Sequence, residues 1–157
     1  MLRDITHADL PELLELNQAH VTELSSLSLA RLRELVQAAF LARCADSRGA
    51  FLLTFDQDAD YDSPNFIWFK ENYGRFVYVD RIVVSPTERG QGLAAKLYKE
   101  LFEIARAGGH SMICCEVNSD PPNPGSDRFH EALGFEEAGH AHLPDRGKSV
   151  RYLVCKL

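Results

Sequence analysis

The sequence predicts an α/β protein in which helices cover both faces of a mixed β-sheet. Some apolar segments occur in pairs joined by polar turns with glycine, and such pairs are typical of β-hairpins. Elsewhere a helical pattern lies between two strand patterns, which is typical of a parallel crossover. The composition is that of a globular protein, with 45% hydrophobic and 25% charged residues in a chain of 157. We therefore expect one domain over residues 1–157, large enough to form its own core.

The first half of the chain is expected to contain a strand, two helices, a hairpin and a short third helix. Leu2–Thr6 has the pattern of a short strand, and Asp9 is expected to cap a helix that ends near Val21. Leucines three and four residues apart predict a second helix after Ser28. The other predicted elements are the hairpin strands Phe40–Ala45 and Ala50–Phe55 and a short aromatic helix over Asn65–Tyr73.

The second half of the chain alternates strands with helices before a final hairpin. Phe76–Val84 is rich in β-branched and aromatic residues, as buried strands are. An apolar stripe predicts a long helix over Gly92–Ala107, and a shorter helix starts at Asn123 or Ser126 and ends at Gly134. The other predicted strands are Ser111–Val117, Phe135–His142 and Val150–Lys156. The two strand–helix–strand crossovers lead us to expect two parallel strand pairs.

The charge balance and the cysteine spacing exclude several classes of protein. With 23 acidic and 17 basic residues the net charge is −6, which argues against nucleic-acid binding because such surfaces are usually basic. No apolar segment approaches the roughly 20 residues that cross a bilayer, so we expect no membrane partner. The polar N-terminal sequence lacks signal-peptide features, and we expect a cytoplasmic location. The four cysteines have no metal-binding spacing, so we expect free thiols and no metal.

The strongest functional signal is a glycine-containing loop between a strand and a helix. Here Val84 ends a strand pattern, and Arg89-Gly90-Gln91-Gly92 lead into a helix. Backbone N–H groups at such a helix start bind anions, pyrophosphate in particular. The two glycines would let phosphates approach the backbone, and Arg89 would add a positive charge. Taken alone, the loop is equally consistent with an ordinary turn.

Two motifs together resemble the GNAT superfamily of acyl-CoA N-acetyltransferases. The first, Arg89-Gly90-Gln91-Gly92-Leu93-Ala94, resembles the family signature Gln/Arg-x-x-Gly-x-Gly/Ala. The second, Asn123-x-x-Ser126-x-x-Phe129-His130-x-x-x-Gly134-Phe135, resembles the family segment Asn-x-x-Ala-x-x-Leu-Tyr-x-x-x-Gly-Phe. The order of predicted elements also agrees over essentially the whole chain. The resemblance implies a GNAT-like, mostly antiparallel sheet of six to seven strands that splays between two central parallel strands.

The resemblance also implies a site for acetyl-CoA (coenzyme A) as co-substrate. The strand backbone would pair with the pantetheine arm, and the glycine loop would hold the pyrophosphate. The thioester would enter where the sheet splays, with Asn123 at the mouth of the site. The residues expected to bind the cofactor are Ile82, Val83, Val84, Arg89, Gly90, Gln91, Gly92, Leu93, Ala94, Asn123, Ser126 and Phe129.

Transfer to an amine needs a base, and Asp80 and Glu116 are the candidates. Strand alternation is expected to place Tyr78, Asp80 and Ile82 on one face, with Glu116 on the next parallel strand. Partial burial there would raise the pKa of a carboxyl group. The position that matches the usual base of the family is Tyr78, which is not an acid. The alternative is that both carboxylates are solvated or paired, for example Asp80 with Arg81.

The family often has a tyrosine that protonates the leaving CoA thiolate, and this sequence has His130 at that position. Histidine can donate a proton near neutral pH. The alternative is that His130 only packs or bonds a backbone carbonyl.

These signals predict an N-acetyltransferase that acts on a primary amine of a small molecule or peptide, by direct transfer in a ternary complex. The alternative from another class is a non-catalytic acyl-CoA-binding sensor. The sequence does not identify the amine acceptor, and it leaves a homodimer open.

Overall fold

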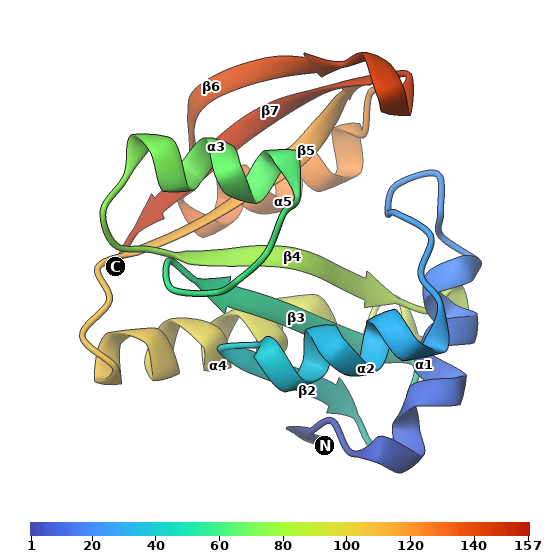
Figure 1. The fold of residues 1–157 in the computed structure, drawn as a ribbon. Helices are drawn as coiled ribbons and strands as arrows, with labels where there is room; N and C mark the ends of the chain where they lie inside the picture. Colours follow the sequence, from blue (N-terminus) through green and yellow to red (C-terminus); the bar gives the residue numbers. More distant parts are fainter.

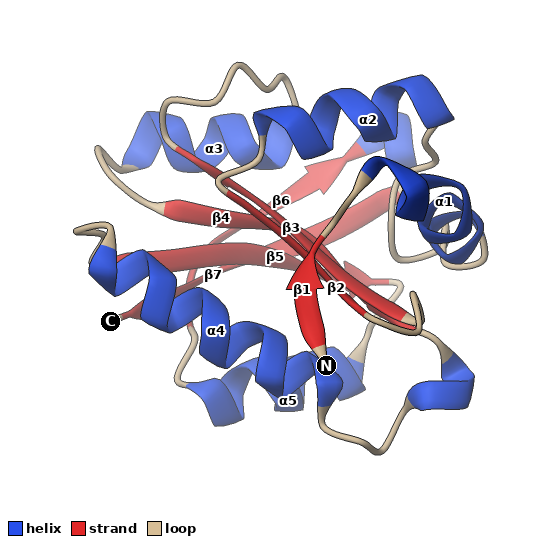
Figure 2. Cartoon of the chain, turned by 90° about the horizontal axis from the view of Figure 1, so that it is seen from below, coloured by secondary structure: helices blue, strands red, loops and turns tan.

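The computed structural model describes residues 1–157, and it has one seven-stranded sheet between two layers of helices (Figure 1). Helices α1, α2 and α3 cover one face of the sheet, and α4 and α5 cover the other (Figure 2). The strands are β1 (Leu2–Asp4), β2 (Leu41–Ala45), β3 (Ala50–Asp56), β4 (Val77–Val84), β5 (Met112–Asp120), β6 (Glu136–Leu143) and β7 (Lys148–Lys156). The helices are α1 (Leu10–Gln18), α2 (Leu29–Ala38), α3 (Pro64–Asn72), α4 (Leu93–Ala107) and α5 (Pro124–Leu133).

The strand order is β1-β2-β3-β4-β5-β7-β6, and every neighbouring pair is antiparallel except β4–β5. The α/β class, the mixed sheet and the helices on both faces are therefore confirmed. The expectation of two parallel pairs is wrong for the second crossover, because β7 lies between β5 and β6. The burial pattern explains this order, since β7 is largely buried whereas β6 is mostly exposed and forms the edge of the sheet.

The predicted elements are all present, with shifted ends. The first helix ends at Gln18 rather than near Val21, and the last hairpin strand begins at Lys148 rather than Val150. Asp9 precedes α1, but its carboxylate does not cap that helix. It is fully buried and instead accepts hydrogen bonds from Arg3, at 2.7 and 2.8 Å, and from Arg48, at 2.6 Å. The carboxylate also accepts hydrogen bonds from the Thr6 N–H and hydroxyl, so its acceptor positions are occupied by groups other than the first N–H groups of α1.

Two hydrophobic cores lie on the two faces of the sheet. The core under α1, α2 and α3 is rich in aromatic side chains, and the core under α4 contains mostly aliphatic ones. Trp68 of α3 stacks on Tyr152 of β7, with ring centroids 4.2 Å apart and an interplanar angle of 15°. The same indole covers Gly139 of β6, where a Cβ would lie 2.5 Å from the Trp68 ring. The final hairpin is thereby packed against α3 (Figure 1).

None of the helices in the structure has both the length and the apolar character needed to cross a membrane.

Candidate active site

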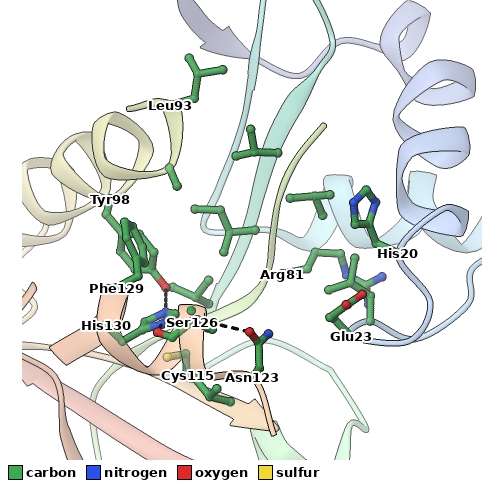
Figure 3. A pocket seen from close by; sticks show the side chains of 18 of the residues that line it. His20, Glu23, Arg81, Leu93, Tyr98, Cys115, Asn123, Ser126, Phe129 and His130 are labelled. Carbon is green, nitrogen blue, oxygen red and sulfur yellow. Dashed lines mark hydrogen bonds between the residues drawn. The ribbon is translucent and has the colours of Figure 1, made fainter. Parts of the chain in front are cut away.

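A cleft opens where the two parallel strands separate. β4 and β5 pair only at Val77–Ile113 and Tyr78–Cys114, and beyond these two pairs they share no register. The resulting cleft has a volume of about 800 Å³. Its walls are residues 79–84 of β4, residues 115–118 of β5, and parts of α4 and α5 (Figure 3). A volume of this size is typical of a site for a small molecule or a cofactor.

A β-bulge at Asp80 lies in the wall of this cleft. Two consecutive residues of β3 pair with Val79 and Arg81, so Asp80 between them has no partner. A bulge bends the strand and reverses the alternation of side chains beyond it. The expectation that Tyr78, Asp80 and Ile82 share one face is therefore wrong: Tyr78 belongs to the core under α1–α3, whereas Ile82 packs against the core under α4.

The loop before α4 has the backbone of an anion-binding site. Gly90 and Gly92 have φ angles of 84° and 72°, which other residues adopt only at a cost. A Cβ at either glycine would meet no atom within 4 Å, so the loop faces open space. No side chain caps α4, whose first N–H groups therefore remain free to bind an anion.

The structure gathers the predicted cofactor residues around the cleft, with one exception. Gln91 is exposed and does not line it. The residues that do line it are Ile82, Val83, Val84, Arg89, Gly90, Gly92, Leu93, Ala94, Asn123, Ser126 and Phe129. Asn123 also caps α5, because its Oδ1 accepts a hydrogen bond from the Ser126 N–H at 3.3 Å.

Glu116 of β5 lies deep in the cleft, held by neutral donors. The Tyr78 hydroxyl donates to its two carboxylate oxygens at 2.9 and 2.8 Å, and Asn65 Nδ2 of α3 donates at 2.9 Å. Asn65 is oriented in turn by the Tyr152 hydroxyl, 2.9 Å from its Oδ1. Burial is the main cause that raises the pKa of Glu116 to about 7, and the charge of Asp80 adds to it. A carboxyl group that titrates near neutral pH can take and release a proton.

The carboxylate of Asp80 is bound by two neighbouring side chains. Its carboxylate accepts a hydrogen bond from the Tyr61 hydroxyl at 2.6 Å and forms an ion pair with Arg81 at 2.7 Å. Arg81 is buried and also donates to Asn17 at 2.7 Å and to the Ser25 hydroxyl at 3.0 Å. The paired alternative considered for Asp80 is therefore the arrangement found. This ion pair connects the bulge of β4 to α1 and the segment that follows it.

His130 of α5 is buried on the opposite wall of the cleft, in contact with Tyr98 of α4 (Figure 3). Its Nδ1 lies 2.8 Å from the Ser126 carbonyl oxygen, which can only accept, so Nδ1 carries the proton in the neutral ring. Nε2 then accepts the hydrogen bond from the Tyr98 hydroxyl at 2.8 Å. Burial lowers the pKa of His130, which favours this neutral form.

The cysteines and the remaining acidic residues add no metal site. No group of three or more His, Cys, Asp or Glu side chains is arranged to hold a metal ion. Cys114 and Cys115 are buried in the two opposite cores, and burial raises the pKa of both thiols. Neither is thereby favoured as a thiolate nucleophile.

The sequence that forms this cleft matches a known protein family. A family model described as "Acetyltransferase (GNAT) family" matches residues 31–135, more than half of the chain. The chain belongs to the GNAT acetyltransferase family. The match spans the glycine loop, Glu116 and the downstream motif up to Phe135. A search of curated proteins gives no match.

Solved structures share the GNAT fold of this chain. The ribosomal-protein-alanine N-acetyltransferase from Brucella melitensis is 21% identical, with a TM-score of 0.72 over 100% of this chain and 99% of that one. The yncA structure from Salmonella typhimurium with acetyl-CoA is 19% identical, with a TM-score of 0.71 over 100% and 93%. The NatC complex bound to Gag peptide and CoA is 15% identical, with a TM-score of 0.74 over 100% and 98%. At these identities the likeness concerns the fold.

Three residues around this cleft were not anticipated from the sequence. Tyr98 has the spacing of a core position in α4, and only its bond to His130 distinguishes it. His20 follows α1, and its Nε2 lies 3.4 Å from Arg89 across the cleft. Lys148 lines the cleft from the start of β7. For Tyr98, the one signal in the sequence was a tyrosine within an apolar stripe. For His20 and Lys148 there was none, because their positions at the cleft depend on how segments far apart in the chain meet.

Proposed function

We propose that this GNAT protein transfers the acetyl group of acetyl-CoA to a primary amine, directly and within a ternary complex. The observation that carries this proposal is the state of Glu116. It is a carboxyl group inside the cleft, hydrogen-bonded to Tyr78 and Asn65, with a pKa near 7. Such a group is suited to remove a proton from an ammonium substrate near neutral pH.

The residues along the cleft fit acetyl-CoA. When bound, this co-substrate supplies an acetyl thioester as the acetyl donor. The backbone of β4 beyond Tyr78 has no partner strand on the β5 side, so its N–H and C=O groups are free to pair with an extended arm. The open loop at Gly90 and Gly92 and the uncapped start of α4 fit a pyrophosphate, and Arg89 supplies a positive charge.

The roles of the base and the acid follow from the two walls of the cleft. We assign the base to Glu116, because Asp80 is already paired with Arg81. Glu116 takes one proton from the ammonium group, the neutral amine forms the new C–N bond as the thioester C–S bond breaks, and solvent takes the second proton from the nitrogen as the amide forms. Asp80 then serves as a positioning residue that holds the bulge and the Arg81 side chain in place.

We assign the proton for the leaving thiolate to the pair formed by His130 and Tyr98. Since Nδ1 of His130 keeps its proton on the Ser126 carbonyl, the transferable proton is the one between Tyr98 Oη and His130 Nε2. Solvent afterwards returns one proton to this pair and takes one from Glu116, so that, with the second amine proton, each turnover releases one proton overall. Positioning of the thioester and the amine within the cleft supplies the remainder of the rate enhancement.

Calorimetric titration of acetyl-CoA, followed by thiol release against a panel of primary amines, tests the proposal. We expect binding, and release of free CoA with at least one class of amine. The Glu116→Gln variant should bind acetyl-CoA as the wild type does and lose turnover. Binding without thiol release from any amine would instead support a non-catalytic acyl-CoA sensor. Absence of binding would contradict the assignment of the cleft.

A further inference from the structure

A second, smaller recess, which His130 does not line, adjoins Glu116. It has a volume of about 30 Å³, larger than the roughly 10–15 Å³ that a cavity needs to hold one water molecule. Glu116, Asp80, Arg81 and Lys148 line both the recess and the main cleft, so the two spaces meet at the proposed base. The recess therefore accommodates one small polar group that lies beside the reacting amine.

Some of the charged side chains around this recess have an ion-pair partner and others have none. Asp80 and Arg81 neutralise each other, and Glu116 is held by uncharged donors. The other charged residues that line it are Glu23, Arg146 and Lys148, and the side chains of these three form no hydrogen bond or ion pair. Two positive groups without an ion pair, Arg146 and Lys148, thus face the recess together with the unpaired carboxylates of Glu23 and Glu116.

The geometry of the last hairpin places both cations at this recess. β6 and β7 are joined by a short 3-10 turn that ends at Arg146, and Lys148 is the first residue of β7. Lys148 lies on the same face of β7 as Val150 and Tyr152, because alternate residues of a strand share a face. Val150 and Tyr152 belong to the core that contains Tyr78. Lys148 is partly buried on that face, and its charge interacts with those of Glu116 and Glu23. A cation in such a position gains most from an anionic partner.

We propose that the acceptor of this enzyme is a small amine that also carries a carboxylate, an amino-acid-like molecule. Its carboxylate binds Lys148 and Arg146 in the recess, and its amino group lies at Glu116. The volume of the recess fits a carboxylate and leaves no room there for a continuing polypeptide. This inference rests on the proposed function, which it makes more specific by naming the class of acceptor.

Matched acceptors test the inference. A panel of free amino acids, each paired with its own carboxamide, is assayed for CoA release with saturating acetyl-CoA. We expect each accepted amino acid to have a kcat/KM at least about tenfold above that of its carboxamide, the size of one lost charged hydrogen bond. The α-amino group of the carboxamide is less basic than that of the free amino acid, so a larger fraction of it is neutral at a given pH. A preference for the acid therefore cannot come from the supply of neutral amine.

Variants locate the effect. Lys148→Gln should raise KM for the amino acid about tenfold or more, and it should lower kcat/KM for the amino acid more than for the carboxamide, so that the preference for the acid is lost. Lys148→Arg should retain most of the activity toward the acid. Lys156→Gln, at the opposite and exposed end of β7, is the matched control and should change neither.

The possible failures are distinguishable. If carboxamides or other uncharged amines turn over as well as the acids, or if Lys148→Gln impairs both partners equally, the inference is wrong while the acetyltransferase proposal stands. If acetyl-CoA binds but no amine of either kind releases CoA, the proposed function itself fails, and this inference fails with it.

Discussion

Replacement of Glu116 by glutamine separates the cost of its burial from its role as a base. The amide keeps an oxygen that can accept from Tyr78 and Asn65, but it cannot ionise. In the folded protein the pKa of Glu116 is raised from 4.5 to about 7. At 1.36 kcal/mol for each pKa unit, ionising this buried group costs about 3 kcal/mol of stability.

The sign of the pH dependence follows from proton binding. Between about pH 4.5 and 7 the folded state holds the Glu116 proton more tightly than the unfolded state does. The stabilising contribution of the protonated carboxyl is therefore complete below pH 4.5 and is lost as the pH rises through 7. In Glu116→Gln this loss is absent, so relative to the wild type the variant should gain about 3 kcal/mol between those limits.

Urea unfolding of both proteins over this pH range measures the effect. For a chain of this size the gain corresponds to about 6–12 °C in Tm above pH 7. Glu103→Gln, at an exposed position of α4, is the control and should follow the wild-type profile. The same Glu116→Gln variant should lose turnover, and wild-type activity should fall as the pH drops below about 7. Parallel stability profiles for wild type and Glu116→Gln would refute the reasoning.

Three further predictions concern other parts of the site and of the fold. Arg89→Glu should weaken acetyl-CoA binding about tenfold or more in calorimetry by reversing a charge beside the glycine loop, whereas Arg33→Glu on the exposed face of α2 should not. Tyr98→Phe should lower kcat more than it changes KM, because it removes the proton that the buried histidine shares; equal losses in binding would indicate a packing role. Asp9→Asn should lower the unfolding free energy by about 2 kcal/mol at neutral pH with acetyl-CoA affinity unchanged, since it weakens two charge-assisted interactions. The guanidinium of Arg3 holds the pKa of Asp9 well below its usual value of 3.8, so this difference should narrow progressively as the pH falls below about 4.

Local patterns were enough to predict the elements of this fold. The glycine-ended turn between β2 and β3 and the apolar stripe of α4 each depend on residues close in sequence, and both were placed correctly. The order of the last strands was not predicted correctly, because it depends on which strand of the final hairpin buries more surface. Val150, Tyr152 and Leu153 make β7 the buried strand, which only the assembled sheet shows.

The candidate site was predictable where motifs carry it. The glycine loop and the α5 motif led to the residues that line the cleft, and Glu116 was one of two carboxylates considered. The sequence could not choose between Glu116 and Asp80, because that choice depends on a bulge and on partners far along the chain. Asp80 meets Tyr61 and Arg81, whereas Glu116 meets Asn65 and Tyr78. Lys148 was missed for the same reason, since its place at the recess comes from the turn of the last hairpin.

The stacking of Trp68 on Tyr152 gives this protein a built-in optical probe. Trp68 is its only tryptophan, so the intrinsic indole fluorescence comes from a single known position. Its stacked neighbour Tyr152 bonds Asn65, and Asn65 bonds Glu116, so two hydrogen bonds separate the ring pair from the proposed base. The emission of Trp68 therefore senses changes at the carboxyl group and in the final hairpin, without any attached label.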